Sequence, residues 1–70
     1  MIENKIVFEF TDEEYELLCK KAMLNDELAQ IFYMKIHDYS IIQIADAVNL
    51  SVRTVNRRID KLKRKIKRAL

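Results

Sequence analysis

The spacing of hydrophobic residues changes after the first ten positions of the chain. Ile6, Phe8 and Phe10 alternate onto one side, which predicts a short strand. Beyond them, apolar residues recur every three or four positions, the spacing of amphipathic helices. The sequence therefore predicts an N-terminal strand or arm over residues 1–10 and a helical domain over residues 11–70.

A lone strand has no partner within the chain for its backbone hydrogen bonds. It can pair with the same segment of a second subunit, which gives a symmetric dimer, or pack on the helices as an extended arm. A core built from 70 residues leaves a thin margin of stability unless a second copy contributes burial. We therefore expect a homodimer.

Polar residues mark the starts of the helices. The predicted N-caps are Thr11, Asn25, Ser40 and Ser51. Glu14 and Gln43 stand three positions after Thr11 and Ser40 and complete capping boxes.

The first helix is expected to run to about Leu24. Its inward-facing residues are Tyr15, Leu18, Cys19 and Ala22, and those of the second helix are Leu28, Ile31, Phe32 and Ile36. Tyr33, Met34 and Tyr39 are also expected in the core.

A helix-turn-helix is indicated at about residues 40–64. Ala45 is small enough for two helices to cross closely, and Val48 and Leu50 provide apolar anchors at the turn. Val55, in the next helix, drops into the same core. The predicted fold is an all-α bundle of about four helices, with the third and fourth joined by a turn of roughly three residues.

The composition limits the turns and the chemistry. The chain has no Gly and no Pro, so a tight turn must place another residue, usually Asn or Asp, in the left-handed conformation. Cys19 and His37 are the only residues of their types, so neither a disulfide nor a four-ligand zinc site is expected. His37 has no evident nucleophile partner. We expect no catalytic residues, no metal, no cofactor and no enzymatic activity.

Charge divides the chain into two halves. Residues 1–38 hold nine acids and four bases, a net charge of −5, and residues 39–70 hold two acids and nine bases, a net charge of +7. This polarity points to a polyanion as the partner of the second half, although a solvated basic helix explains the charge alone equally well.

The sequence gives no sign of a membrane partner. No apolar run approaches the length of a spanning helix, and residues 1–10 lack the basic stretch of a signal peptide. Binding of the basic last helix to a membrane surface is disfavoured because its apolar stripe contains no Phe or Trp. We expect a cytoplasmic, nucleoid-associated protein.

The last helix has two opposite faces. At 100° per residue, three apolar side chains fall within about 40° of the direction of a fourth, Val55. The three are Ile59, Leu62 and Ile66, and the opposite side carries Arg53, Arg57, Arg64 and Arg68. This is the expected geometry of a recognition helix.

These residues carry a resemblance to a known family. The matching positions are Ile44, Ala45, Val48, Leu50, Ser51, Thr54, Val55, Ile59 and Leu62. They resemble the helix-turn-helix of bacterial sigma factor region four, particularly the extracytoplasmic-function type, and more distantly that of response-regulator output domains. The resemblance covers roughly residues 28–68. Where the family usually has Gly in the turn, this chain has Asn49, which tolerates the left-handed conformation. A complete sigma factor also needs a separate region for which 70 residues leave no room, so we expect one only if this chain is a fragment.

The resemblance and the residue chemistry together imply a DNA interface. The residues expected to read base edges are Arg53, Thr54, Asn56 and Arg57. The residues expected to contact phosphates are Ser40, Gln43, Ser51, Arg58, Lys61 and Arg64. The implied function is sequence-specific binding of double-stranded DNA by a transcriptional regulator of a bacterium or phage.

Two other interpretations stay open. Region four also contacts RNA polymerase, so the chain could be an interaction module that binds polymerase or a sigma or anti-sigma partner without reading DNA. The apolar residues of the last helix also follow heptad spacing, and Ile66 to Leu70 could meet a second subunit in a coiled coil.

Overall fold

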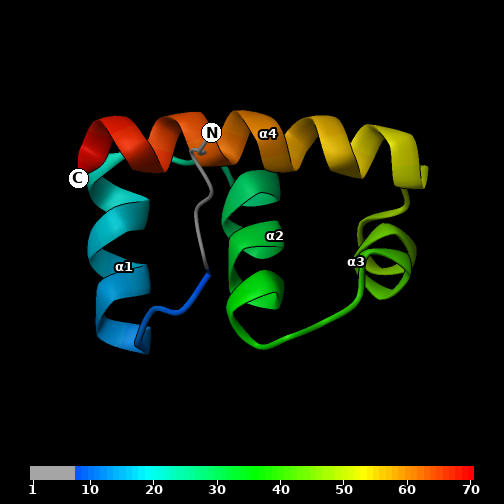
Figure 1. Ribbon diagram of the computed structural model, residues 1–70, viewed down its shortest axis with the longest axis horizontal. Coiled ribbons are helices and arrows are strands. Elements are labelled where there is room, and N and C mark those ends of the chain that lie inside the picture. Colours follow the sequence, from blue (N-terminus) through cyan, green and yellow to red (C-terminus); the bar gives the residue numbers. More distant parts are fainter. Residues whose placement is uncertain (1–7) are drawn as a thin grey trace, which may run out of the picture.

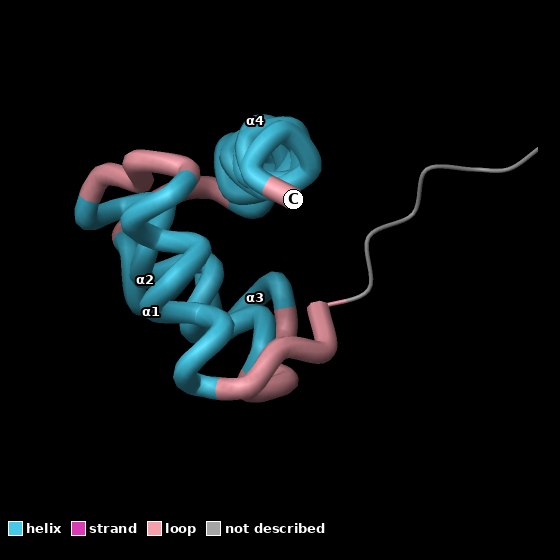
Figure 2. Tube along the Cα trace, turned by 90° about the vertical axis from the view of Figure 1, so that its left-hand side faces the viewer, coloured by secondary structure: helices cyan, strands magenta, loops and turns pink. Residues whose placement is uncertain are grey.

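The computed structural model describes residues 8–70, which form four helices and no strand. The helices are α1 (Asp12–Lys21), α2 (Asp26–Ile36), α3 (Ile41–Val48) and α4 (Val52–Ala69). α1 and α2 stand next to each other, and α4 crosses their ends and reaches α3 (Figure 1). Figure 2 looks along α4, with the other three helices to one side of it. The prediction of a small all-α bundle is confirmed.

Each helix begins at its predicted N-cap because a side-chain oxygen there accepts a hydrogen bond from an early backbone N–H. Both predicted capping boxes are present. The N–H of Glu14 donates to Thr11 Oγ1 (3.1 Å), and the N–H of Thr11 donates to Glu14 Oε1 (2.8 Å). Ser40 and Gln43 repeat this exchange at the start of α3, with the same two distances.

The first three helices end in the same way, although the chain has no glycine. A residue just after each helix takes the left-handed conformation: Met23 (φ 53°), Asp38 (φ 62°) and Asn49 (φ 59°). The next N–H in each case donates to a carbonyl five residues back: Leu24 to Cys19 (3.1 Å), Tyr39 to Met34 (3.0 Å) and Leu50 to Ala45 (3.0 Å). This is the Schellman closure. Asn49 was expected in this role, whereas Met23 was not, and it ends α1 at Lys21 instead of near Leu24.

The core lies where α4 crosses the other helices. Its fully buried side chains are Leu28, Ile31, Phe32, Ile44, Val55, Leu62 and Ile66. Met34 is buried, as expected, but Ile36 is only half-buried. The expectation for the two tyrosines was wrong: Tyr33 and Tyr39 are 45% and 43% exposed, because they fall outside the stripe that faces α4.

Residues 1–7 of the predicted strand or arm lie outside the part of the chain that the structure describes, and residues 8–10 are not in a strand. Phe8 and Phe10, at the end of this segment, both pack edge-on against Phe32, with ring centroids 6.0 and 5.6 Å away. These two rings cover the core from the N-terminal side. Pairing of the strand with a second subunit stays untested.

The heptad spacing of α4 serves the domain itself. Val55, Ile59, Leu62 and Ile66 are all buried against the other helices, and Ile66 has no exposed surface. The stripe therefore offers no free seam at Ile66 for a coiled coil with a second chain. The alternative that Ile66 to Leu70 meet a second subunit in this way is not supported.

Candidate nucleic-acid interface

The helix-turn-helix consists of α3, a short turn and the first half of α4. Ala45 is buried where the two helices meet, and Val48 and Leu50 are half-buried on either side of the turn. Val55 is fully buried below them. The anchors predicted from the sequence are confirmed, and they hold the first turns of α4 beside α3 at one end of the molecule (Figure 1).

The first turn of α4 presents most of its side chains outward. Arg53, Asn56 and Arg57 are exposed, as a base-reading role requires. Thr54 is half-buried, and its hydroxyl accepts a hydrogen bond from Ser51 Oγ (3.0 Å). Its N–H donates to the same Ser51 oxygen (3.1 Å). Ser51 therefore both caps α4 and fixes the Thr54 side chain beside the exposed arginines.

The residues expected to contact phosphates fall into two groups. Ser40 and Gln43 are exposed at the start of α3, and the Ser40 hydroxyl and the Gln43 amide oxygen are engaged in the capping box. Their capping role is therefore certain, and a phosphate contact would have to use their remaining donors. Lys61 and Arg64 are exposed on α4. Arg58, by contrast, is half-buried.

Arg58 links α4 to α2. Its Nε donates to Glu27 Oε1 at 2.5 Å, and the side chains of Arg58 and Glu27 are 41% and 36% exposed. α4 carries nine Lys and Arg residues, and within residues 8–70 Arg58 is the only one that pairs with a carboxylate. The other eight charges are uncompensated by close contacts in this part of the chain, so α4 is a strongly positive element.

One acidic residue interrupts this positive surface. Asp60 is exposed on α4, one helical turn from Asn56 on one side and from Arg64 on the other. Asp60 was not singled out from the sequence, although the same 100° spacing that groups the arginines places it among them. It is the only acid in α4.

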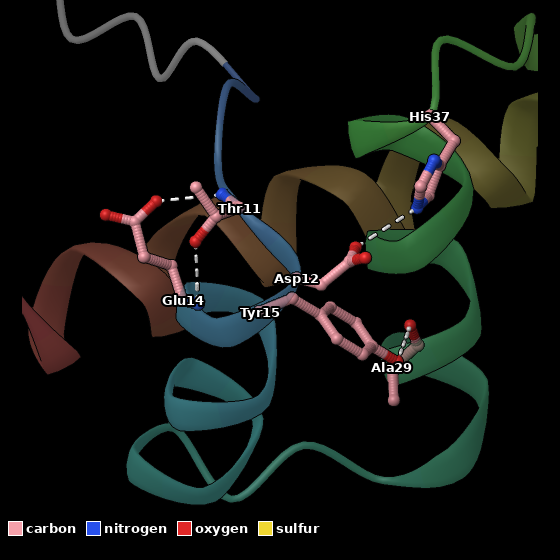
Figure 3. A network of polar contacts seen from close by, with 6 residues as sticks. All are labelled: Thr11, Asp12, Glu14, Tyr15, Ala29 and His37. Atoms are coloured by element: carbon pink, nitrogen blue, oxygen red, sulfur yellow. Dashed lines mark hydrogen bonds and ion pairs between the residues drawn. The ribbon is translucent and has the colours of Figure 1, made fainter.

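A second polar network joins α1 to α2 away from the helix-turn-helix (Figure 3). The Tyr15 hydroxyl donates to the carbonyl of Ala29 (3.1 Å), and burial raises the pKa of Tyr15 to about 12. His37 Nε2 lies 3.5 Å from Asp12 Oδ1, and its ring lies against Tyr33. These contacts connect two helices, so His37 has a structural role.

The remaining side chains that could carry chemistry are isolated. Cys19 is half-buried, and burial raises the pKa of its thiol. Among the described residues, no three His, Cys, Asp or Glu side chains gather as metal ligands.

None of the four helices in residues 8–70 is long and apolar enough to cross a membrane.

A short helix that ends at a left-handed residue and is followed by a longer helix, basic on its outer side, defines a helix-turn-helix domain. The model of the family "Sigma-70, region 4" matches residues 15–70, and the chain belongs to this family. The match also covers most of α1, which the resemblance noted from the sequence left out. Comparison with curated proteins and with solved structures gives no match. Family membership makes the chain a transcription-related helix-turn-helix module, of a kind that serves DNA and RNA polymerase binding.

Proposed function

We propose that this protein is a transcriptional regulator that binds double-stranded DNA sequence-specifically through α4. The observation that carries this proposal is the exposed basic face of α4, opposite the buried stripe of a helix-turn-helix. Helix-turn-helix proteins insert the start of this second helix into the major groove. The proposed site of action is the nucleoid in the cytoplasm.

The exposed side chains of the first two turns supply the base contacts. Arg53 and Arg57 can each bond a guanine bidentately, and Asn56 can do so with an adenine. Thr54 offers its methyl group or its hydroxyl proton. Lys61 and Arg64 contact the phosphates that flank the groove, and Ser40, Gln43 and Ser51 contribute at two helix N-termini.

Selection from a random duplex library tests this proposal. The purified chain is mixed with the library at two salt concentrations, and the bound DNA is sequenced. We expect an enriched motif whose binding is lost in an Arg53→Ala, Arg57→Ala double variant. A Lys20→Ala, Lys21→Ala variant removes the same charge from α1 and should keep the motif. No enrichment and no binding at low salt would refute the proposal.

Binding to RNA polymerase, or to a sigma or anti-sigma partner, is a second candidate function. The observation that favours it is the acidic outer surface of α1, where four carboxylates are exposed: Asp12, Glu13, Glu14 and Glu16. If the chain binds only proteins and no DNA, it should bind polymerase in a pull-down, and the Arg53→Ala, Arg57→Ala variant should retain that binding. It would select no DNA.

A homodimer remains part of the proposal because the chain is short and its core small. Two subunits would read half-sites about one helical turn of DNA apart. Sedimentation with and without the selected duplex measures the stoichiometry. A single chain that binds one undivided site with nanomolar affinity would contradict the dimer and leave DNA binding intact.

A further inference from the structure

The contact between Glu27 and Arg58 is unusual in its place on the molecule. It joins residues 31 positions apart, and it neutralises one arginine on a helix where every other basic side chain lacks a carboxylate partner within residues 8–70. A protein that gains affinity for DNA from positive charge would lose some of it through Glu27. The contact therefore needs a role that outweighs this loss.

The geometry of the contact leaves most of the guanidinium available. Only Nε of Arg58 is engaged, by one oxygen of Glu27. A guanidinium has five N–H donors, so the four on the two Nη atoms have no hydrogen-bond acceptor within residues 8–70. Because the guanidinium is planar, a bond at Nε fixes the direction in which the Nη donors point.

Arg58 also lies on the side of α4 that a DNA backbone would approach. At 100° per residue, Thr54, Arg58 and Lys61 fall within about 60° of one another, on one flank between the buried stripe and the exposed arginines. Thr54 is in the turn expected to read bases, and Lys61 is expected to contact a phosphate. A phosphate at the edge of the groove would meet the Nη donors of Arg58 on the same flank.

We infer that Glu27 is a positioning residue for DNA binding, which holds the Arg58 guanidinium so that its Nη donors meet a backbone phosphate. This inference rests on the proposed function. Glu27 supplies no DNA contact itself. It fixes the Arg58 side chain in one rotamer before DNA binds. The entropy that an unrestrained arginine would lose on binding is therefore already lost, and the phosphate contact becomes more favourable. It also ties the middle of α4 to the start of α2.

The direction in which the substitution Glu27→Gln changes the affinity for DNA distinguishes positioning from simple electrostatics. Glu27→Gln removes a negative charge, which by itself should tighten DNA binding slightly. Loss of positioning should instead weaken binding of the library-selected duplex by about three- to tenfold. Glu16→Gln removes an equal charge from an exposed residue of α1 and should change the affinity less than about twofold.

Two further measurements exclude a merely structural effect. The dependence of log K on log salt should become shallower by about 0.9 in Glu27→Gln, because one phosphate contact is lost. In an Arg58→Gln background, Glu27→Gln should no longer weaken binding. Thermal unfolding of each variant sets the temperature at which all of them are folded during the titrations.

The outcomes distinguish this inference from the proposed function. If the wild-type chain binds DNA but Glu27→Gln binds equally well or more tightly, Glu27 does not position Arg58 and the inference is wrong. The same holds if the salt dependence is unchanged, or if Glu27→Gln still weakens binding in the Arg58→Gln background. If the wild-type chain binds no duplex at low salt, the proposed function itself fails.

Discussion

Two single residues depart from what their surroundings favour. Met23 takes the left-handed conformation at the end of α1, although its side chain is 82% exposed and gains little from that position. Asp60 places a negative charge among the arginines of α4. Each departure can be removed by one substitution that disturbs no buried contact, and each therefore gives a clear measurement.

Met23→Gly should stabilise the fold. A left-handed conformation costs a residue with a side chain roughly 1 to 2 kcal/mol, and the larger entropy of glycine in the unfolded chain offsets about half of this. We expect a gain of up to about 1 kcal/mol in the free energy of unfolding, or about 4 to 8 °C in Tm. Gln30→Gly, at an exposed position within α2, should lose about 1 kcal/mol. Equal destabilisation by both substitutions would show that the conformation of Met23 carries no strain.

Asp60→Asn should tighten binding to non-specific duplex DNA. Removing the carboxylate relieves its repulsion of the phosphates, and we expect a gain of about two- to fivefold at low salt. Glu13→Gln, on the exposed start of α1, is the matched control and should leave the affinity nearly unchanged. Fluorescence anisotropy with a labelled duplex measures both. An unchanged affinity in Asp60→Asn would place DNA away from this part of α4.

The helices differ in how they are held to one another. α3 and α4 meet through apolar anchors around Asn49, so their angle depends on packing. α1 is tied to α2 by polar contacts as well, of which the hydrogen bond from Tyr15 to the carbonyl of Ala29 is half-buried. The strength with which α1 is held to α2 should therefore depend on pH. The helix-turn-helix does not include this hydrogen bond, so its packing should not change with pH for this reason.

The stability of the fold should fall as the pH rises from about 10 through 12. The pKa of Tyr15 is raised from its ordinary value of 10 to about 12, so the neutral form of its side chain is favoured in the folded protein. Its contribution is complete below pH 10 and is lost through pH 12. Tyr15→Phe should be less stable than wild type by about 1 kcal/mol at pH 7, with the difference shrinking over this window. Denaturant titrations of both proteins at several pH values measure this.

Tyr39→Phe serves as the control for the pH series. The Tyr39 hydroxyl makes no hydrogen bond within residues 8–70, and its side chain is 43% exposed. This variant should follow the wild-type curve throughout. A constant difference between Tyr15→Phe and wild type up to pH 12 would mean that ionisation of Tyr15 does not oppose folding.

At the scale of the whole molecule, what could be predicted from the sequence depended on distance along the chain. The capping signals at Thr11 and Ser40 act over three residues, so the helix starts were correct. The end of α1 was missed because Met23 carries no turn signal. The contact of Glu27 with Arg58 spans two helices, and no local pattern indicates it.

Whether the burial of a side chain could be predicted also depended on how local its cause is along the chain. The buried stripe of α4 was predicted because it obeys the helical period throughout its length. Tyr33 and Tyr39 were wrongly expected in the core because their burial depends on the direction in which α2 and the following loop face α4. That direction is set by tertiary packing. The family match to residues 15–70 supplies the part of the first helix that the motif alone did not identify.

The start of α4, supported by α3, is the surface that we propose meets DNA. Amide chemical shifts of the ¹⁵N-labelled chain, recorded while the selected duplex is added, locate that surface directly. We expect the largest shifts at residues 51–61 and at the N-terminus of α3, with α1 little affected. Shifts that concentrate on α1, or no shifts at low salt, would contradict it.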